Sequence, residues 1–135
     1  MRKALPIIAL LYFGWSPWAF GACPDLRAFY DASDGYALGR PAWEDVRLQL
    51  SKIFDQCLQS SEYFALYGAA QLNTGRLPES MESLERSLML DPDNGAALID
   101  YADALLRDGQ LFAAIEANAL LLVREDVPDD LELQI

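Results

Sequence analysis

The sequence contains the same unit twice between Ser61 and Pro128, and this repetition restricts the fold more than any other feature. Aligned with itself, the stretch matches best at an offset of 34 residues, which is the separation of Tyr67 and Tyr101. The same offset pairs further identical residues: Ala70 with Ala104, Leu72 with Leu106, Gly75 with Gly109, Leu77 with Leu111, Glu82 with Glu116, and Leu88 with Leu122. A period of this size is typical of stacked helix–turn–helix repeats. The sequence therefore predicts an all-α fold, a right-handed α-solenoid of antiparallel helix pairs.

Composition narrows the possible functions. The chain has 135 residues, the size of one domain, and its hydrophobic content of 53% is sufficient for a packed core. With 21 acidic and 10 basic residues, the net charge is −11, which repels nucleic-acid backbones and anionic lipid surfaces. The absence of histidine removes the commonest general base and metal ligand. We therefore expect no nucleic-acid partner.

The first 22 residues have the pattern of a signal peptide. Arg2 and Lys3 provide the positive start, residues 4–13 are apolar, and Gly21-Ala22 offers small residues for cleavage. The alternative is a transmembrane anchor, but Pro6 and Pro17 leave too short an uninterrupted apolar span. We predict that residues 1–22 are removed and that the mature protein is exported.

Cys23 follows directly and has two possible roles. In an exported protein it could form a disulfide with Cys57, the only other cysteine. The segment from Phe20 to Cys23 also resembles a bacterial lipoprotein cleavage site, in which the cysteine carries the lipid, although an aliphatic residue is usual where Phe20 stands. Lipidation would leave Cys57 as a free thiol. We favour the disulfide.

The region before the repeats divides into an irregular segment, 23–40, and a predicted capping helix, 41–59. Pro41 suits the first turn of a helix, and the acidic pair Glu44-Asp45 suits its positive end. Apolar residues then recur at steps of three and four, which predicts one helical stripe made of Trp43, Val46, Leu50, Ile53, Phe54 and Cys57.

The repeated residues resemble the tetratricopeptide repeat family. Its pattern combines a large apolar residue, an apolar–small pair, a turn glycine, small residues in the second helix and a closing proline. The first repeat, 61–94, supplies Phe64, Tyr67-Gly68, Gly75, Ser80, Leu84, Ser87 and Pro92. The second repeat, 95–128, supplies Leu98, Tyr101-Ala102, Gly109 and Ala114, and it departs from the pattern at Asn118 and Leu121. The resemblance implies a scaffold for binding and does not specify the ligand.

Catalytic and metal-binding patterns are missing from the sequence. The segment from Asp91 to Gly95 has the alternating oxygen ligands of a calcium loop, but Ala96 and Ala102 stand where such a loop needs glycine and glutamate. Glu79, Glu82 and Glu85 fall on a helical stripe opposite the apolar one, where solvated side chains belong. Two cysteines without histidine do not complete a usual zinc site. We predict no active site, no metal and no cofactor.

The family resemblance also implies a concave groove. In tetratricopeptide proteins, the first helix of each repeat lines a groove that binds an extended or helical peptide. The corresponding stripe here consists of Glu62, Ala65, Ala69, Leu72, Asn73, Ala96, Ile99, Asp103, Leu106 and Arg107. The alternative is that this stripe is ordinary surface or is covered by more chain. Because Arg107 is the only cation of the set, we expect an apolar or basic ligand rather than an acidic one.

Two functions remain as hypotheses. The first is a protein–protein interaction module in the periplasm of a Gram-negative bacterium, soluble or tethered through a lipid on Cys23. The second is the periplasmic start of an outer-membrane export or assembly protein. It rests on a resemblance to the surface lipoprotein assembly modifiers, which place tetratricopeptide repeats between a signal peptide and a membrane β-barrel. That hypothesis requires the natural chain to continue beyond Ile135 into barrel strands.

The end of the sequence indicates that two repeats are not self-sufficient. The last long helix carries too many apolar residues for one facing helix to cover: Leu111, Ile115, Leu120, Leu121, Leu122 and Val123. Residues 129–135 have the pattern of the start of a further helix, in which Leu131 and Ile135 share one face. We therefore expect a longer solenoid or self-association through this apolar surface.

Overall fold

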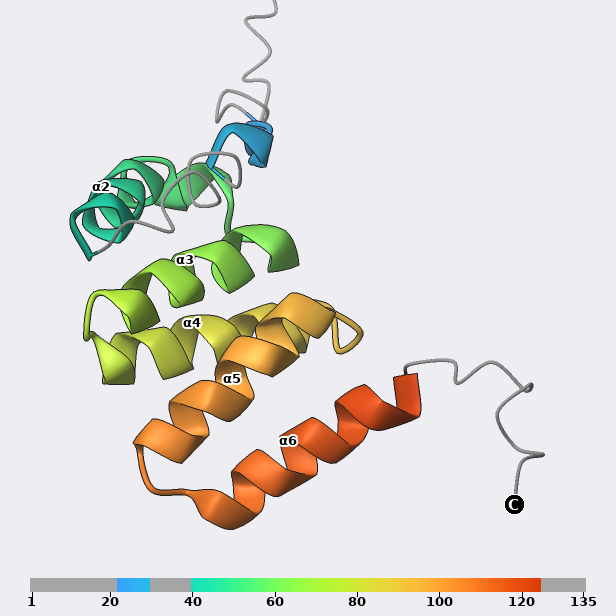
Figure 1. Ribbon diagram of the computed structural model, residues 1–135. Coiled ribbons are helices and arrows are strands. Elements are labelled where there is room, and N and C mark those ends of the chain that lie inside the picture. The colour runs from blue at the N-terminus through green and yellow to red at the C-terminus, as the bar shows by residue number, and fades with distance from the viewer. Residues whose placement is uncertain (1–21, 30–39, 125–135) are drawn as a thin grey trace, which may run out of the picture.

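The computed structural model describes residues 22–29 and 40–124, and the regular elements in these ranges are helical. In chain order they are α2 (Arg40–Ser51), the 3-10 turn η1 (Phe54–Gln56), α3 (Ser61–Asn73), α4 (Leu77–Leu90), α5 (Gly95–Arg107) and α6 (Leu111–Arg124). Each α-helix packs on its neighbours in the chain, and α3 also contacts α5. Figure 1 shows the helices following one another from α2 to α6. The prediction of an all-α fold is confirmed.

Several predicted segments fall partly or wholly outside the described residues. They are residues 1–21 of the predicted signal peptide, residues 30–39 of the irregular segment, the last four residues of the second repeat, and the predicted helix start at 129–135. Within the irregular segment, residues 23–26 have no regular structure and residues 27–29 form a helical turn.

The predicted capping helix, 41–59, is wrong over residues 52–59, because α2 ends at Ser51. The N–H groups of Lys52 and Ile53 donate to carbonyls three residues back rather than four, so the helix tightens and stops. The carbonyl of Leu50 also accepts a bond from the buried Tyr63 hydroxyl at 2.8 Å, which satisfies an acceptor at the helix end. Ile53 and Phe54 keep a helical spacing in the sequence, and this spacing hid the break.

A disulfide joins the two cysteines, as predicted. Cys23 and Cys57 are bonded with their Cα atoms 4.7 Å apart, and Cys57 is buried. With its sulfur in this bond, Cys23 has no thiol for a lipid. Cys57 belongs to the larger apolar cluster, in which the N-terminal segment, α2 and α3 meet: Leu26, Val46, Leu50, Cys57, Tyr63, Phe64, Leu66 and Ala70. The first repeat is therefore covered on its N-terminal side by a region that the disulfide cross-links.

The two repeats begin and turn in the same way at the 34-residue offset. Ser60 caps α3 by accepting the Tyr63 N–H at 3.1 Å, and Asn94 caps α5 by accepting the Ala97 N–H at 3.1 Å. In the turn after each first helix stands a glycine with positive φ, 80° at Gly75 and 81° at Gly109. The next residue in each turn donates to a carbonyl five positions back at 2.9 Å. The sequence repetition is thus a repetition of structure.

A group of small polar side chains ties the start of α3 to the end of α4 and to α5. The Ser61 hydroxyl donates to the Ser87 carbonyl at 2.9 Å, and the Ser87 hydroxyl donates to the Ser61 carbonyl at 2.7 Å. The Asn94 side-chain amide donates to the Ser61 hydroxyl oxygen at 2.9 Å. Because these bonds satisfy the hydroxyls, small polar residues occupy a close helix contact at little cost.

Gly68 is the point of closest approach between α3 and α4. A Cβ placed there would lie 2.6 Å from Cγ of Leu84, which is fully buried. Below it, the buried Ser80 hydroxyl donates to the Gly68 carbonyl at 2.8 Å. Ser80, Leu84 and Ser87, which match the repeat pattern on this helix, are all fully buried.

The second repeat has a thinner core. Its main buried cluster contains Ala102, Leu105, Ala114 and Ala117, most of which are alanines. Much of α6 is exposed, and Phe112 and Val123 are 84% and 83% accessible. The expectation of an apolar outer side on this helix is confirmed.

Candidate functional site

The α3 half of the predicted groove is not open. Ala65, Ala69 and Leu72 are buried, and Ala65 and Leu72 are 2% and 3% exposed. Ala65 and Leu72 share an apolar cluster with Ala97 and Ala104 of α5, which packs on α3. Of the five predicted α3 residues, only Glu62 and Asn73 at the two ends are exposed. The prediction was wrong here because the next repeat covers this face, which the phase of one helix cannot reveal.

The α5 half of the predicted groove is accessible. Ile99 and Leu106 are 58% and 49% exposed, Ala96 and Arg107 are exposed, and Asp103 is half-buried. These residues, Ala96, Ile99, Asp103, Leu106 and Arg107, are called the open face of α5 below. The 34-residue offset relates Ile99 to Ala65 and Leu106 to Leu72. The open face is therefore the counterpart, in the second repeat, of the face that α5 covers in the first.

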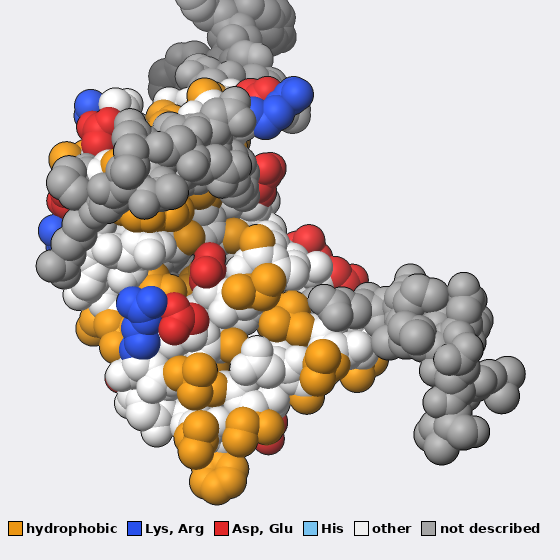
Figure 2. All heavy atoms as spheres, viewed as in Figure 1, with side chains coloured by type: hydrophobic (Ala, Val, Ile, Leu, Met, Phe, Trp, Pro, Cys, Tyr) orange, Lys and Arg blue, Asp and Glu red, His pale blue; other side chains and the backbone are white. Residues whose placement is uncertain are grey.

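The apolar surface continues onto the last helix. Figure 2 shows hydrophobic side chains gathered over α5 and α6 in the lower part of the molecule. The exposed large apolar residues of α6 are Leu111, Phe112, Ile115, Leu120, Leu122 and Val123. Contiguous apolar surface of this kind marks interaction sites on soluble proteins.

Acidic groups give the open face its charge. Arg107 donates to both carboxylate oxygens of Asp103, at 3.1 and 2.6 Å, one helical turn apart. Burial raises the pKa of the neighbouring Asp100 to about 6, and the Asp103 carboxylate adds to this shift while Arg107 opposes it. With both carboxyls ionised, two aspartates and one arginine leave this region with a net negative charge at neutral pH.

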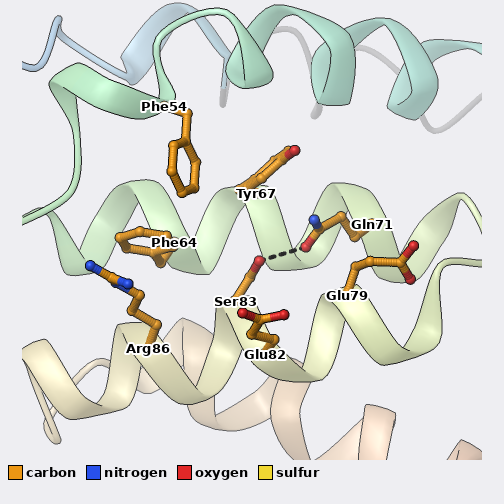
Figure 3. Close-up of a pocket in the computed structure, with 8 residues that line it drawn as sticks. All are labelled: Phe54, Phe64, Tyr67, Gln71, Glu79, Glu82, Ser83 and Arg86. Atoms are coloured by element: carbon orange, nitrogen blue, oxygen red, sulfur yellow. Dashed lines mark hydrogen bonds between the residues drawn. The ribbon is translucent and has the colours of Figure 1, made fainter.

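A separate pocket lies between η1, α3 and α4, and it is called the aromatic pocket below. Its volume is about 160 Å³. Its lining residues, drawn in Figure 3, are Phe54, Phe64, Tyr67, Gln71, Glu79, Glu82, Ser83 and Arg86. The Arg86 guanidinium carbon lies 5.0 Å from the centre of the Phe64 ring. The Ser83 hydroxyl donates to the Gln71 side-chain oxygen at 2.6 Å, so the two buried polar groups satisfy each other.

The sequence did not reveal the aromatic pocket. Phe64, Tyr67 and Gln71 share one side of the predicted first helix of the repeat, and Glu79 and Glu82 belong to the predicted solvated stripe. Phe54 was assigned to a continuous capping helix, whereas η1 turns it onto Phe64, with the two ring centres 5.9 Å apart. The sequence feature that could have indicated the pocket is the run of aromatic residues Phe54, Phe64 and Tyr67, followed by glutamates three residues apart at 79 and 82.

Two further kinds of feature, a metal site and a membrane-spanning helix, were sought in the described residues. In residues 22–29 and 40–124, no group of three or more Asp, Glu, Cys or His side chains is placed to hold a metal ion. Across the same part of the chain, no helix has the length and apolar character needed to cross a membrane.

Comparison with known proteins adds no family assignment: no protein-family model matches the chain, and no curated protein matches it with significant similarity.

Proposed function

We propose that this protein is a protein-interaction module built as an α-solenoid of two tetratricopeptide-like units, and that its open α5 face binds a helical segment of a partner. One observation carries the proposal: the positions that α5 covers on α3 recur, 34 residues later, as the exposed Ile99 and Leu106. The repeated caps and glycine turns support the solenoid architecture. A stacked repeat buries this face on its neighbour, and in the described residues Ile99 and Leu106 remain exposed and available to a partner.

The contact between α3 and α5 indicates which residues a partner helix needs on its contact face. On α3 the occupant is a helix that contributes Ala97 and Ala104, seven residues apart and therefore on one helical face. On α5 the corresponding contact residues are the larger Ile99 in place of Ala65 and an identical leucine, Leu106, so the partner helix needs equally small residues at that spacing. Covering the exposed parts of Ile99 and Leu106 contributes about 1 kcal/mol each.

Charge further restricts the partner. Asp100 and Asp103 lie beside the apolar contact residues, and the chain as a whole carries a net charge of −11. A partner with acidic residues at its edge would be repelled, whereas basic edge residues would pair with these carboxylates. The proposed partner is therefore a helix with an apolar, small-residue face and a basic rim.

We place the protein in the periplasm of a Gram-negative bacterium. The signal-like pattern of residues 1–22 supports export, and the Cys23–Cys57 disulfide fits an oxidising compartment. The disulfide cross-links the region before the repeats and involves no residue of the open face of α5, so it is compatible with binding at that face.

Site-specific photo-crosslinking tests the proposed surface. A photoreactive benzoylphenylalanine replaces Ile99 in one variant and Met89 in a control variant; Met89 is an exposed apolar residue on α4, away from the open face. In cells that make the protein, we expect position 99 to give a specific adduct with a helical segment that has small residues seven apart. Adding Leu106→Glu should abolish this adduct. Equal labelling at both positions would refute the surface.

A further inference from the structure

The aromatic pocket already holds a cation against one of its rings. Phe54, Phe64 and Tyr67 contribute three aromatic side chains to a single opening (Figure 3). The faces of such rings carry negative charge density and attract cations within about 6 Å of the ring centre. Arg86 lies within that distance of Phe64, at 5.0 Å. Phe54 is partly exposed, and its ring centre lies 6.5 Å from that of Tyr67.

The charges around the pocket are not balanced. Glu79 and Glu82 are both exposed at its edge, and within the described residues neither carboxylate has a hydrogen-bond or ion-pair partner. By contrast, Glu85 on the same helix accepts a bond from the Tyr101 hydroxyl at 2.9 Å. Two carboxylates and one guanidinium give the pocket a net charge of −1 (−2 + 1). One additional monovalent cation would neutralise it.

The size of the pocket limits what the cation belongs to. A volume of about 160 Å³ suits the head of one side chain. The Gln71 and Ser83 side chains, which also line the pocket, are neutral and bond to each other, so they add no charge to it. Aromatic walls with carboxylates at the rim suit an organic monocation, and a planar, weakly hydrated guanidinium suits them better than a strongly hydrated ammonium.

We propose that the aromatic pocket binds one organic monocation, the guanidinium or ammonium head of an arginine or lysine side chain or of a small free amine. The cation lies among the rings of Phe54, Phe64 and Tyr67 and is paired with Glu79 and Glu82. This site is independent of the proposed function, since it uses none of the open-face residues and lies on other helices.

NMR titration of the full, disulfide-bonded chain tests the pocket. The probes are Nα-acetyl-arginine amide and Nα-acetyl-lysine amide, with the neutral Nα-acetyl-norleucine amide and the anionic Nα-acetyl-glutamate amide as controls. We expect the two cationic probes to shift the ring protons of Phe54 and Tyr67 in a saturable way, and the controls to leave them unchanged. Equal binding of the neutral probe would show a merely apolar pocket and would refute the proposal.

Three variants sharpen this test. Glu82→Gln should weaken the binding of the arginine probe about two- to fivefold, as expected for an exposed charge pair. Glu116→Gln is the matched control, because Glu116 is the exposed residue 34 positions further along, and it should leave binding unchanged. Arg86→Gln should tighten binding by a similar factor, since it frees the face of Phe64 and removes a like charge. Weaker cation binding in Arg86→Gln, or binding of the glutamate probe through Arg86, would overturn the proposal.

The source of the cation is distinguished by two further probes, methylguanidinium and a capped pentapeptide with one central arginine among alanines. Tighter binding of the pentapeptide supports a basic residue of a polypeptide as the natural ligand. Equal binding of the two probes supports a small free amine or guanidine instead. Failure of all cationic probes to bind would refute the site, while the photo-crosslink at position 99 would be unaffected.

Discussion

The two repeats share their local structure and differ in what surrounds them. Caps, glycine turns and helix bounds recur at the 34-residue offset, yet Ala65 and Leu72 are buried while the corresponding Ile99 and Leu106 are about half exposed. The first repeat lies between α2 and α5, whereas among the described helices the second repeat has only the first repeat as a neighbour. The comparison shows that a repeat sequence encodes the helix pair, whereas the neighbouring element decides which face of that pair is core and which is available for binding.

The largest effect should come from the cross-link that fixes the covered side of the first repeat. Replacing both cysteines, Cys23→Ala with Cys57→Ala, opens a loop with a sequence separation of 34 residues. The chain-entropy model assigns to a loop of this length about 4 kcal/mol of unfolding free energy. Urea unfolding followed by circular dichroism measures the loss, with reduction of the native chain as the control. Identical midpoints for the oxidised protein and the variant would contradict the predicted role.

Much of this architecture follows from local sequence. Ser60, Asn94, Gly75 and Gly109 act through bonds within a few residues, so capping and turn rules place them without knowledge of the fold. Gly68 fills the small position of the repeat pattern, and a Cβ added there would lie only 2.6 Å from Cγ of Leu84, which explains why that position is small. Such features need only the helix phase and the turn residues.

The errors concern contacts between distant parts of the chain. The end of α2 depends on the Tyr63 hydroxyl reaching the Leu50 carbonyl, which no helical periodicity reports. The groove prediction treated both first helices alike, but α5 covers one of them. The aromatic pocket requires Phe54 to be turned toward α3, so it became visible only with the break in α2. Burial by a neighbour, rather than propensity, decided each of these cases.

A matched pair of leucine truncations tests the difference between the repeats directly. Leu72→Ala removes a buried side chain from the α3–α5 contact, and core truncations of this kind cost about 2–5 kcal/mol. Leu106→Ala removes the corresponding half-exposed side chain, where about 0.5 kcal/mol is expected. Thermal and urea unfolding of the two variants should separate them clearly. Equal destabilisation would mean that Leu106 is covered in solution, by another copy or by other parts of the chain.

The contact between α3 and α4 should tolerate no added side chain. Gly68→Leu forces a side chain into Leu84 and overpacks a buried contact, at about 1–3 kcal/mol or more. Glu82→Ala, on the exposed side of α4, should change the unfolding free energy by less than about 0.5 kcal/mol. Differential scanning calorimetry of both variants provides the test. Similar melting temperatures would show that the helix phase of the first repeat has been assigned incorrectly.

The smallest predicted effect concerns Asp100, where the second repeat replaces a buried residue of the first. The 34-residue offset relates Asp100 to Leu66, a member of the core cluster beside α2. Burial raises the pKa of the Asp100 carboxyl from 3.8 to about 6, so the folded state binds this proton more tightly than the unfolded state does. Folding stability from this group is then present at low pH and is lost as pH rises from about 4 to about 6.

Asp100→Asn removes that pH dependence and should stabilise the protein at pH 7 by about 1–2 kcal/mol, less than the full shift implies, because the residue is partly exposed. At pH 4 the variant and the native chain should differ little, because the native carboxyl is then protonated in the folded state. Asp45→Asn, at an exposed position on α2, is the control and should give no gain at either pH. Urea unfolding at pH 4, 5, 6 and 7 measures the difference. A constant difference across this range would show that Asp100 is as well solvated as Asp45, and that no buried charge lies beside the open face of α5 for a partner to neutralise.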